Sequence, residues 1–337
     1  MKAVAYQIPG SLDRDQPLSD VNLDDPVARG RDLLVEVKAV SVNPVVCKVR
    51  AAVAPEPGQW KVLGWDVAGV VVSTGDAVQN FSPGDSVWYA GSIARDGANS
   101  ELHLVDERIV GPKPERLSFP ESAALPLTGI TAWEMLFDRL QVGRPVAGAP
   151  NAIVIIGGAG GVGSAAIQLL RALTDLTVIA SASRPATRAW VERLGAHHVI
   201  DHSEPLAPQI QSLGIAPPPF VFSTNSTAQY VTQIAELISP QGRFGLIDDP
   251  PEFDIRAFKR KSVSVHWEFM FTRAVFETDD IEEQGRLLRR LSELVDSRRI
   301  ESTATEIMRP INAANLIAAQ RVLESGTARG KIVLEGF

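Results

Sequence analysis

A strand, a glycine-rich turn and a helix follow one another in the middle of the chain, and they constrain its fold more than any other feature. The run Ala152–Ile156 is apolar and rich in β-branched residues, which is typical of a buried parallel strand. After the turn a helix is predicted over 164–173, where Ile167, Leu170 and Leu173 recur at helical spacing. This unit predicts an α/β fold built on a parallel sheet.

The turn contains the pattern G-x-G-x-x-G. In such a turn the first glycine permits the bend, the second lets the backbone approach a diphosphate, and the third lets the helix pack on the strand. The helix N-terminus adds N–H groups and a partial positive charge. The pattern predicts a dinucleotide-binding turn whose contacts come from Gly158, Gly160, Gly161, Val162 and Gly163.

The end of the next predicted strand, 177–180, indicates which dinucleotide binds. A cofactor with a free ribose hydroxyl favours an Asp or Glu there, but no acid occurs over 176–191. The tip instead carries Ser181, Ser183 and Arg184, which can hydrogen-bond a phosphate. This loop favours NADP(H) over NAD(H). The alternative is that Arg184 is a solvated loop arginine.

Size and composition fit a two-domain protein from a reducing compartment. At 337 residues the chain is long for a single core. Its net charge of −7 is dispersed, and no run rich in Lys and Arg indicates nucleic acid. No stretch reaches the roughly 20 apolar residues of a membrane helix, and no signal-peptide core follows Met1. With Cys47 as the only cysteine, we expect a cytoplasmic protein without an internal disulfide.

The pattern of elements changes at about residue 125. Before it, short β-like runs at 33–40, 67–72 and 86–89 are separated by Gly, Pro and Asp. After it, helices and strands alternate as in a doubly wound sheet. The further strands predicted there are 198–200, 220–222, 244–247 and 263–265, followed by helices at about 281–296 and 313–324 and a last strand at 331–334.

Segments along nearly the whole chain carry a family resemblance: 41–44, 64–71, 123–128, 131–134 and 330–334. They are similar to the zinc-independent quinone oxidoreductase branch of the medium-chain dehydrogenase/reductase (MDR) superfamily, and 267–273 resembles its "zinc-type alcohol dehydrogenase-like" subgroup. The resemblance implies a doubly wound Rossmann domain at 126–275, which binds NADP, and a β-rich GroES-like catalytic domain at 1–125, completed by 276–337. It also implies a homodimer joined through the edge strand 263–265.

The zinc ligands of the superfamily are absent from the matching positions. A catalytic zinc in this superfamily needs a Cys, a His and another Cys or Glu, with one open position, but this chain has Asn43, Trp65, Leu127 and Thr128 at or near the matching positions. The four-cysteine loop of the structural zinc is also missing. We therefore predict no metal, and we expect the remaining candidates to be packed or solvated residues, namely Cys47, His103, His197, His198, His202 and His266.

Without zinc to stabilise an alkoxide, reduction is the expected chemistry. A hydride from NADPH can attack a quinone or an α,β-unsaturated carbonyl, and the charge that develops on the carbonyl oxygen needs donors placed beforehand. The expected substrate is a small hydrophobic electrophile in a dry cleft between the domains. The alternatives are reduction of a specific enoyl thioester, or an NADPH-binding redox-sensing or structural protein with little turnover.

The resemblance also implies site residues. It places Asn43 near the nicotinamide ribose, as a candidate catalytic residue, and Thr131 at the nicotinamide ring; it puts Phe269 and Lys331 in the cofactor site. Asn43 could instead be a turn residue, and Thr131 a helix cap. Tyr89 is the candidate proton donor, unless it only lines the pocket and solvent supplies the proton.

Two features leave the substrate open. Val46 stands where the family usually has an Asp after Asn-Pro-Val, so one polar contact of the usual substrate site is missing. Several aromatic residues could line a pocket for a flat substrate or belong to the core, namely Trp65, Trp88, Trp267, Phe269 and Phe271.

Overall fold

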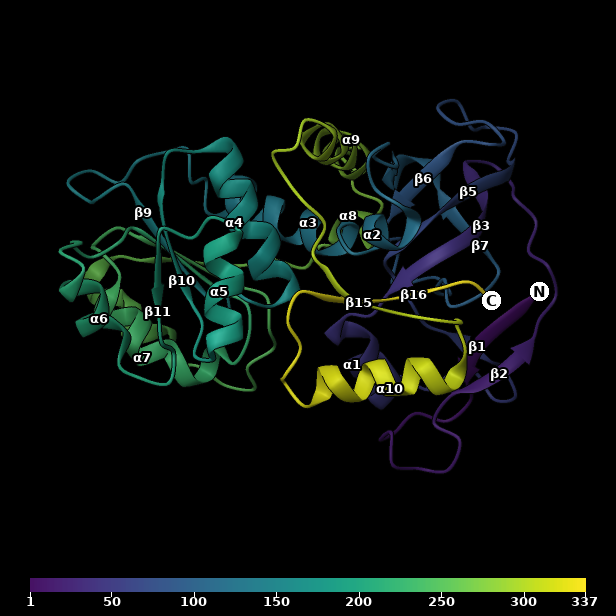
Figure 1. The fold of residues 1–337 in the computed structure, drawn as a ribbon, viewed down its shortest axis with the longest axis horizontal. Helices are drawn as coiled ribbons and strands as arrows, with labels where there is room; N and C mark the ends of the chain where they lie inside the picture. The colour runs from purple at the N-terminus through teal and green to yellow at the C-terminus, as the bar shows by residue number, and fades with distance from the viewer. The chain divides into compact units, whose positions relative to one another are not determined.

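The computed structural model describes residues 1–337. It divides into two compact units, one formed by residues 1–130 and 271–337 and the other by residues 131–270. Both chain termini belong to the first unit (Figure 1). The chain therefore leaves the first unit once, builds the second, and returns to the first.

The second unit contains a six-stranded sheet in which every neighbouring pair is parallel. Its order is β11-β10-β9-β12-β13-β14, so β9 is central and the chain winds outwards from it in both directions. This confirms the doubly wound sheet. The strands are β9 (Ala152–Ile156), β10 (Thr177–Ser181), β11 (His198–Ile200), β12 (Phe220–Ser223), β13 (Arg243–Leu246) and β14 (Ser264–Trp267).

Helices connect these strands. They are α4 (Gly161–Leu173), α5 (Pro185–Arg193), α6 (Leu206–Ser212) and α7 (Thr227–Leu237), with the 3₁₀ segment η3 (Ile255–Lys261) before β14. The helix α3 (Pro126–Trp133) crosses the boundary between the units and continues as the π-helical segment η2 (Glu134–Arg139). The helix α4 begins three residues earlier than the spacing predicts, because Gly163 already lies in its first turn.

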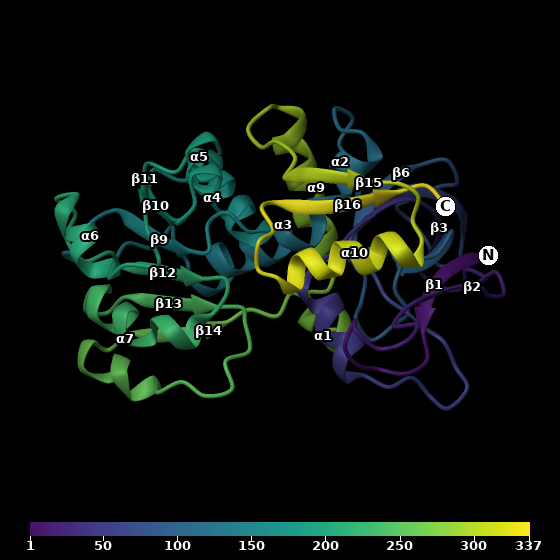
Figure 2. The same cartoon turned by 60° about the horizontal axis from the view of Figure 1, so that its bottom comes forward.

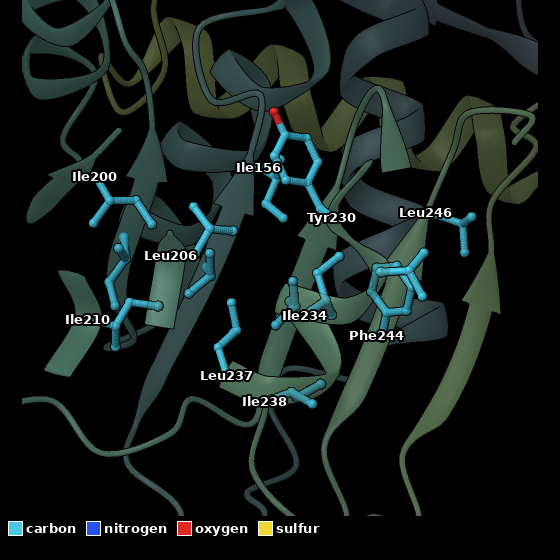
Figure 3. Close-up of a cluster of buried hydrophobic side chains, with 14 of the residues drawn as sticks. Ile156, Ile200, Leu206, Ile210, Tyr230, Ile234, Leu237, Ile238, Phe244 and Leu246 are labelled. Atoms are coloured by element: carbon cyan, nitrogen blue, oxygen red, sulfur yellow. The ribbon is translucent and has the colours of Figure 1, made fainter. Parts of the chain in front are cut away.

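One face of this sheet is covered by an apolar layer (Figure 3). Ile156 and Phe244 from the strands pack with Leu206 from α6 and Ile234 from α7, and each side chain is almost completely buried. Burial of such a side chain contributes roughly 1.5–3 kcal/mol. The layer fixes α6 and α7 on the strands, so the loops at the strands' carboxyl ends are anchored at their bases.

The first unit is built on antiparallel sheets. The larger follows the order β15-β16-β3-β5-β6-β8, with β7 also paired to β3, and the smaller has the order β2-β1-β4. Only β15 and β16 pair in parallel, and they lie side by side next to α10 (Figure 2). The strands are β1 (Lys2–Tyr6), β2 (Ser19–Asn22), β3 (Asp32–Ser41), β4 (Lys61–Val62), β5 (Val67–Thr74), β6 (Ser86–Tyr89), β7 (Leu102–Asp106), β8 (Val110–Pro112), β15 (Ala304–Met308) and β16 (Lys331–Glu335).

Five helices and a 3₁₀ turn complete this unit: α1 (Pro44–Ala52), α2 (Phe119–Ala123), α8 (Thr272–Phe276), α9 (Glu283–Asp296), α10 (Ala313–Glu324) and η1 (Glu107–Ile109). The buried Arg50 on α1 donates to Gln320 on α10 at 2.8 Å and to Glu324. Asn43 is the N-cap of α1, and Pro44 fits the first helical position. No helix in the structure combines the length and the apolar character that crossing a membrane requires.

Candidate active site

The bend after β9 is made at Gly157. Its φ is +80°, a left-handed conformation that favours glycine. A Cβ at this position would also lie 2.3 Å from Oγ1 of Thr224 and 2.5 Å from Oδ1 of Asn225, so the loop after β12 leaves no room for a side chain. The sequence pattern assigns the bend to Gly158, and that assignment is wrong, because the positive φ belongs to the preceding residue.

Gly158 and Gly163 are required for close packing. A Cβ on Gly158 would lie 2.9 Å from Cβ of Ala180, and one on Gly163 would lie 2.4 Å from the carbonyl oxygen of Gly157. Since the atoms met by Gly163 are backbone, they cannot move aside cheaply. The third glycine of the pattern therefore lets α4 approach the turn, as the sequence predicts.

The backbone at Gly160 is open. A Cβ there would meet nothing closer than the carbonyl oxygen of Gly157 at 3.6 Å. Gly160 is the N-cap of α4, and Ser164 makes the first helical bond back to it at 2.9 Å. The N–H groups of Gly161, Val162 and Gly163 precede Ser164, the first residue whose N–H makes a helical bond, so they are available to an anion at the helix's positive end. This cradle fits a diphosphate.

The loop after β10 is joined directly to the glycine turn. Gly157 donates its N–H to Oγ of Ser181 at 3.0 Å, and Gly158 donates to the carbonyl oxygen of Ser181 at 3.2 Å. Arg184 is exposed and is the N-cap of α5, where its N–H bonds Oγ1 of Thr187 at 3.2 Å. The loop thus presents hydroxyls and a guanidinium, with no carboxylate, beside the cradle. Ser181, Ser183 and Arg184 fit a ribose that carries a phosphate.

His202 connects the two serines of this loop, which the sequence does not indicate. Its Nδ1 lies 3.2 Å from Oγ of Ser181, and its Nε2 lies 3.3 Å from Oγ of Ser183. Burial lowers the pKa of His202, the charge of Arg184 lowers it further, and Asp201 opposes both. A residue expected to be only packed or solvated therefore belongs to the candidate cofactor site.

In the first unit, Asn43 and Lys331 belong to one buried network with Asp66. The Lys331 ammonium donates to Oδ1 of Asn43 at 2.6 Å and lies 3.2 Å from Oδ2 of Asp66. Nδ2 of Asn43 donates to the same carboxylate oxygen at 3.1 Å, as does Ser41 at 2.7 Å, while Leu127 N–H donates to the other oxygen at 3.1 Å. Both ends of the Asn43 amide are therefore engaged inside this unit.

The charges of this network are removed from water. Asp66 is completely buried and Lys331 is 4% exposed. Burial raises the pKa of Asp66 and lowers the pKa of Lys331, and in each case the charge of the other residue opposes the shift. Each charge depends on its partner, because an unpaired charge at this depth would be strongly unfavourable.

Tyr89 is paired with His103. Nε2 of His103 lies 3.1 Å from the carbonyl oxygen of Asp96, which can only accept, so Nε2 carries the proton. Nδ1 then accepts from the Tyr89 hydroxyl at 2.9 Å. Burial raises the pKa of Tyr89 well above 10 and lowers the pKa of His103 to about 4. The pair is neutral, and the Tyr89 proton is held by His103, so its role as a proton donor stays a prediction.

The other predicted residues lie elsewhere. Thr131 is buried in α3, and Phe269 follows β14 with about half of its surface exposed. The aromatic residues expected to line a pocket or belong to the core fall into two groups. Trp65, Trp88 and Phe271 are buried, and Trp267 and Phe269 are about half exposed. The structure thus makes the first three core residues of the first unit.

The positions that would ligate zinc in this fold do not fit a divalent cation. Asn43 and the backbone of Leu127 are both bonded to Asp66, and the Lys331 ammonium is already bound to Asn43 and Asp66 in that network. A second cation beside it would be repelled. Trp65 offers only an N–H, which cannot ligate a metal. No three His, Cys, Asp or Glu side chains are grouped in the structure so that they could hold one.

A parallel doubly wound sheet with a diphosphate cradle, in the same chain as a β-rich unit, defines a class of nicotinamide-dependent oxidoreductases. Residues 161–284 match the family of zinc-binding dehydrogenases, and residues 29–115 match the alcohol dehydrogenase GroES-like domain. A zinc-type alcohol dehydrogenase-like protein from Staphylococcus aureus (strain MSSA476) is 36% identical over 336 residues, with 99% of both chains covered. The chain belongs to the medium-chain dehydrogenase/reductase superfamily.

Solved structures agree with this assignment. A protein from Rhizobium etli CFN 42, provisionally named a zinc-dependent alcohol dehydrogenase, is 60% identical with a TM-score of 0.98, covering 100% of this chain and 98% of that one. The quinone oxidoreductase from Coxiella burnetii is 25% identical with a TM-score of 0.80, covering 100% and 99%. The protein is thus an MDR oxidoreductase that resembles quinone oxidoreductases, and its fold implies a NAD(P) cofactor.

Proposed function

We propose that the protein reduces quinones or α,β-unsaturated carbonyls with NADPH and without zinc. The observation that carries the proposal is the chemistry at the superfamily's zinc-ligand positions: Asn43 is bonded to the buried ammonium of Lys331 and to Asp66, and Trp65 offers only an N–H. Such a site offers no ligands for a metal ion that could act as the Lewis acid in alcohol oxidation. Some relatives have zinc in their names, but those names describe the relatives. The residues of this chain argue against a catalytic zinc here.

The preference for NADPH over NADH rests on the loop after β10. Ser181 and Ser183 offer hydroxyls, Arg184 offers a guanidinium that can bind a phosphate through two N–H groups, and residues 181–184 include no carboxylate. The glycine turn lies directly beside this loop, so one continuous surface can hold a diphosphate and a 2′-phosphate.

The bound cofactor would supply a hydride to the electrophilic carbon of the substrate. The chain's part is to hold the cofactor, with Gly160 and the first residues of α4 at the diphosphate. Because the Tyr89 proton is held by His103, we assign the proton that completes the reduction to solvent. We assign to Asn43, whose side chain is held by Lys331, the role of positioning the nicotinamide ribose.

A binding protein with little turnover is the second candidate. Three observations favour it: the Asn43 amide is engaged at both ends, the Tyr89 hydroxyl is paired, and Val46 is buried and apolar where the family usually has an Asp. Such a protein would bind NADPH as a redox sensor or as a structural component and would consume almost none of it.

We also propose a homodimer formed through β14. This strand is an edge of the six-stranded sheet, so one row of its backbone groups is unpaired, and Trp267 on it is 53% exposed. A second copy of the same strand would continue the sheet across a two-fold axis. Sedimentation of the wild type and of Trp267→Lys tests this: a dimer that the charge disrupts supports the proposal, and a monomeric wild type contradicts it.

A binding and turnover experiment tests the proposed activity. Dissociation constants for NADPH and NADH are measured first, and NADPH consumption is then followed with 1,4-benzoquinone, an enone and an enoyl thioester. Tighter binding of NADPH with consumption in the quinone or enone reaction supports the proposal. Consumption with the thioester alone points to the narrower reductase, and tight binding without any consumption points to the second candidate.

A further inference from the structure

We propose that His202 is a specificity-determining residue for the 2′-phosphate of the cofactor, and that binding of this phosphate draws a proton onto its ring. The inference rests on the proposed preference for NADPH. It goes further, because it assigns to one histidine a proton uptake that accompanies NADPH binding and is absent from NADH binding.

The topology places His202 at this site. The strand β11 pairs in parallel with β10, and Ala182 donates its N–H to the carbonyl oxygen of Ile200 at 2.9 Å. The carboxyl ends of the two strands therefore meet, and the ring of His202 reaches across to both serines of the neighbouring loop. Its two nitrogens lie 3.2 Å and 3.3 Å from the hydroxyl oxygens of Ser181 and Ser183.

Counting protons shows what the ring's charge does to these hydroxyls. A neutral imidazole has one nitrogen that must accept, so one serine has to give its O–H to the ring. A protonated ring donates from both nitrogens, and each serine oxygen then accepts from it. Both hydroxyl protons of Ser181 and Ser183 become free to point at another acceptor. Protonation thus turns the loop into a set of donors that carries an added positive charge.

The charged groups around the ring determine its state. Arg184, at the start of α5, disfavours the protonated ring, and Asp201, the residue before His202, favours it. Arg188 on α5 is tied to the backbone of Ala182 and Val199 at 3.2 Å each. Tyr230 on α7 senses the charge of Asp201 and stays neutral, since burial raises its pKa.

These contributions predict a mostly neutral ring at neutral pH in the free protein, because burial and Arg184 both lower the pKa of His202. A phosphate with nearly two negative charges would reverse the balance and favour the protonated ring. NADPH affinity should therefore fall as the pH rises from the free to the bound pKa, by up to about tenfold per pH unit. The phosphate's own ionisation near pH 6 acts in the opposite sense, because a singly charged phosphate binds less well.

Calorimetry tests the proposal on the intact protein. NADPH and NADH are titrated into the wild type, His202→Gln and His266→Gln in buffers with different ionisation enthalpies, between pH 6.5 and 8. His266 is the matched control, because it makes a similar contact with Ser264 at 3.0 Å on the opposite edge of the same sheet. We expect proton uptake with NADPH but not with NADH, its loss in His202→Gln, and its retention in His266→Gln.

The wild type should also lose at least about fivefold in NADPH affinity over this range, and His202→Gln should lose less than about twofold. Proton uptake that persists in His202→Gln would overturn the proposal. Equal affinities for NADPH and NADH at every pH would instead refute the proposed cofactor preference.

A second measurement uses only the wild type, so it does not depend on whether the loop folds correctly in His202→Gln. The ring resonances of His202 are titrated in the wild type by NMR, with and without adenosine 2′,5′-bisphosphate. The proposal predicts a raised pKa for His202 in the complex and no comparable change for His266. An unchanged titration of His202 in a saturated complex would contradict it.

Discussion

The side-chain oxygen of Asn43 lies 2.6 Å from the ammonium of Lys331, although 288 positions separate the two residues in the chain. This contact ties the start of α1 to β16, the last strand, inside the first unit. The same ammonium lies 3.2 Å from Asp66, so a single positive charge binds both the Asn43 amide and the Asp66 carboxylate. The first unit is therefore locked around a buried cation that the chain itself provides.

Removing that cation should destabilise the protein in a pH-dependent way. Lys331→Met leaves the Asp66 carboxyl buried without its partner and should cost about 3–5 kcal/mol near neutral pH. Burial raises the folded pKa of Asp66 above its unfolded value, and the loss of Lys331 raises it further. A carboxyl whose pKa is raised on folding stabilises the folded state at low pH, and this contribution disappears as the pH rises through the folded pKa. The loss of stability caused by Lys331→Met should therefore be smaller at pH 5 than at pH 8.

Denaturant unfolding at the two pH values measures this effect. Lys38→Met is the control, since Lys38 forms an exposed ion pair with Glu36 on β3, and it should change stability by less than about 0.5 kcal/mol. A pH-independent loss in Lys331→Met would mean that Asp66 does not carry the penalty.

Substitution of two glycines in the turn should affect stability and cofactor binding differently. Gly163→Ala places a Cβ against backbone atoms at 2.4 and 2.7 Å, so it should lower both the stability, by about 1–3 kcal/mol, and the affinity for NADPH. Gly160→Ala meets only an ordinary contact at 3.6 Å, and its methyl group would project over the open backbone. It should keep the stability and lose the affinity.

Thermal unfolding and NADPH titration of both variants check this separation. Gly143→Ala is the control, because a Cβ there meets nothing within 4 Å. Unchanged NADPH binding by Gly160→Ala would show that the diphosphate does not pass over this turn.

Loss of the guanidinium at the loop after β10 should affect one cofactor only. Arg184→Ala should weaken NADPH binding by about 10- to 100-fold, the range expected for one or two hydrogen bonds to a charged group, and leave NADH binding unchanged. Arg193→Ala, at the other end of the same helix α5, is the control. An equal loss for both cofactors in Arg184→Ala would place the guanidinium away from the 2′-phosphate.

The hydroxyl of Tyr89 is expected to matter for stability more than for turnover. Tyr89→Phe leaves Nδ1 of the buried His103 without its donor, which should cost about 1–3 kcal/mol of stability. Since that proton is held by His103, kcat for quinone or enone reduction should change by less than about threefold. A loss of more than 100-fold in kcat in a folded variant would instead identify Tyr89 as the proton donor.

Local sequence patterns predicted most of the fold. The β-branched run at Ala152–Ile156 and the glycines after it predicted the central strand and helix, because both depend mainly on neighbours in the chain. The identity of the bending glycine was missed for a tertiary reason. The φ of Gly157 is positive where it packs on Thr224, a contact across 67 positions that no local pattern contains.

The site was predicted less completely, for a similar reason. Ser181 ends the strand β10 and Ser183 follows it closely, so the local pattern predicts both, whereas His202 reaches them only because β10 and β11 are neighbours in the sheet. The adjacency of parallel strand ends is the signal that could have found it. The pairing of Asn43 with Lys331 needed the full three-dimensional structure, since each residue by itself also fits an ordinary cap or surface position.

Removal of metals from a single preparation tests whether the protein reduces its substrate with NADPH and without zinc. NADPH consumption with the best quinone or enone is measured before and after removal of metals with a chelator, and the zinc content is determined each time. We expect the same turnover in both states, with far less than one zinc per chain. Turnover that disappears on chelation and returns with added zinc would contradict it.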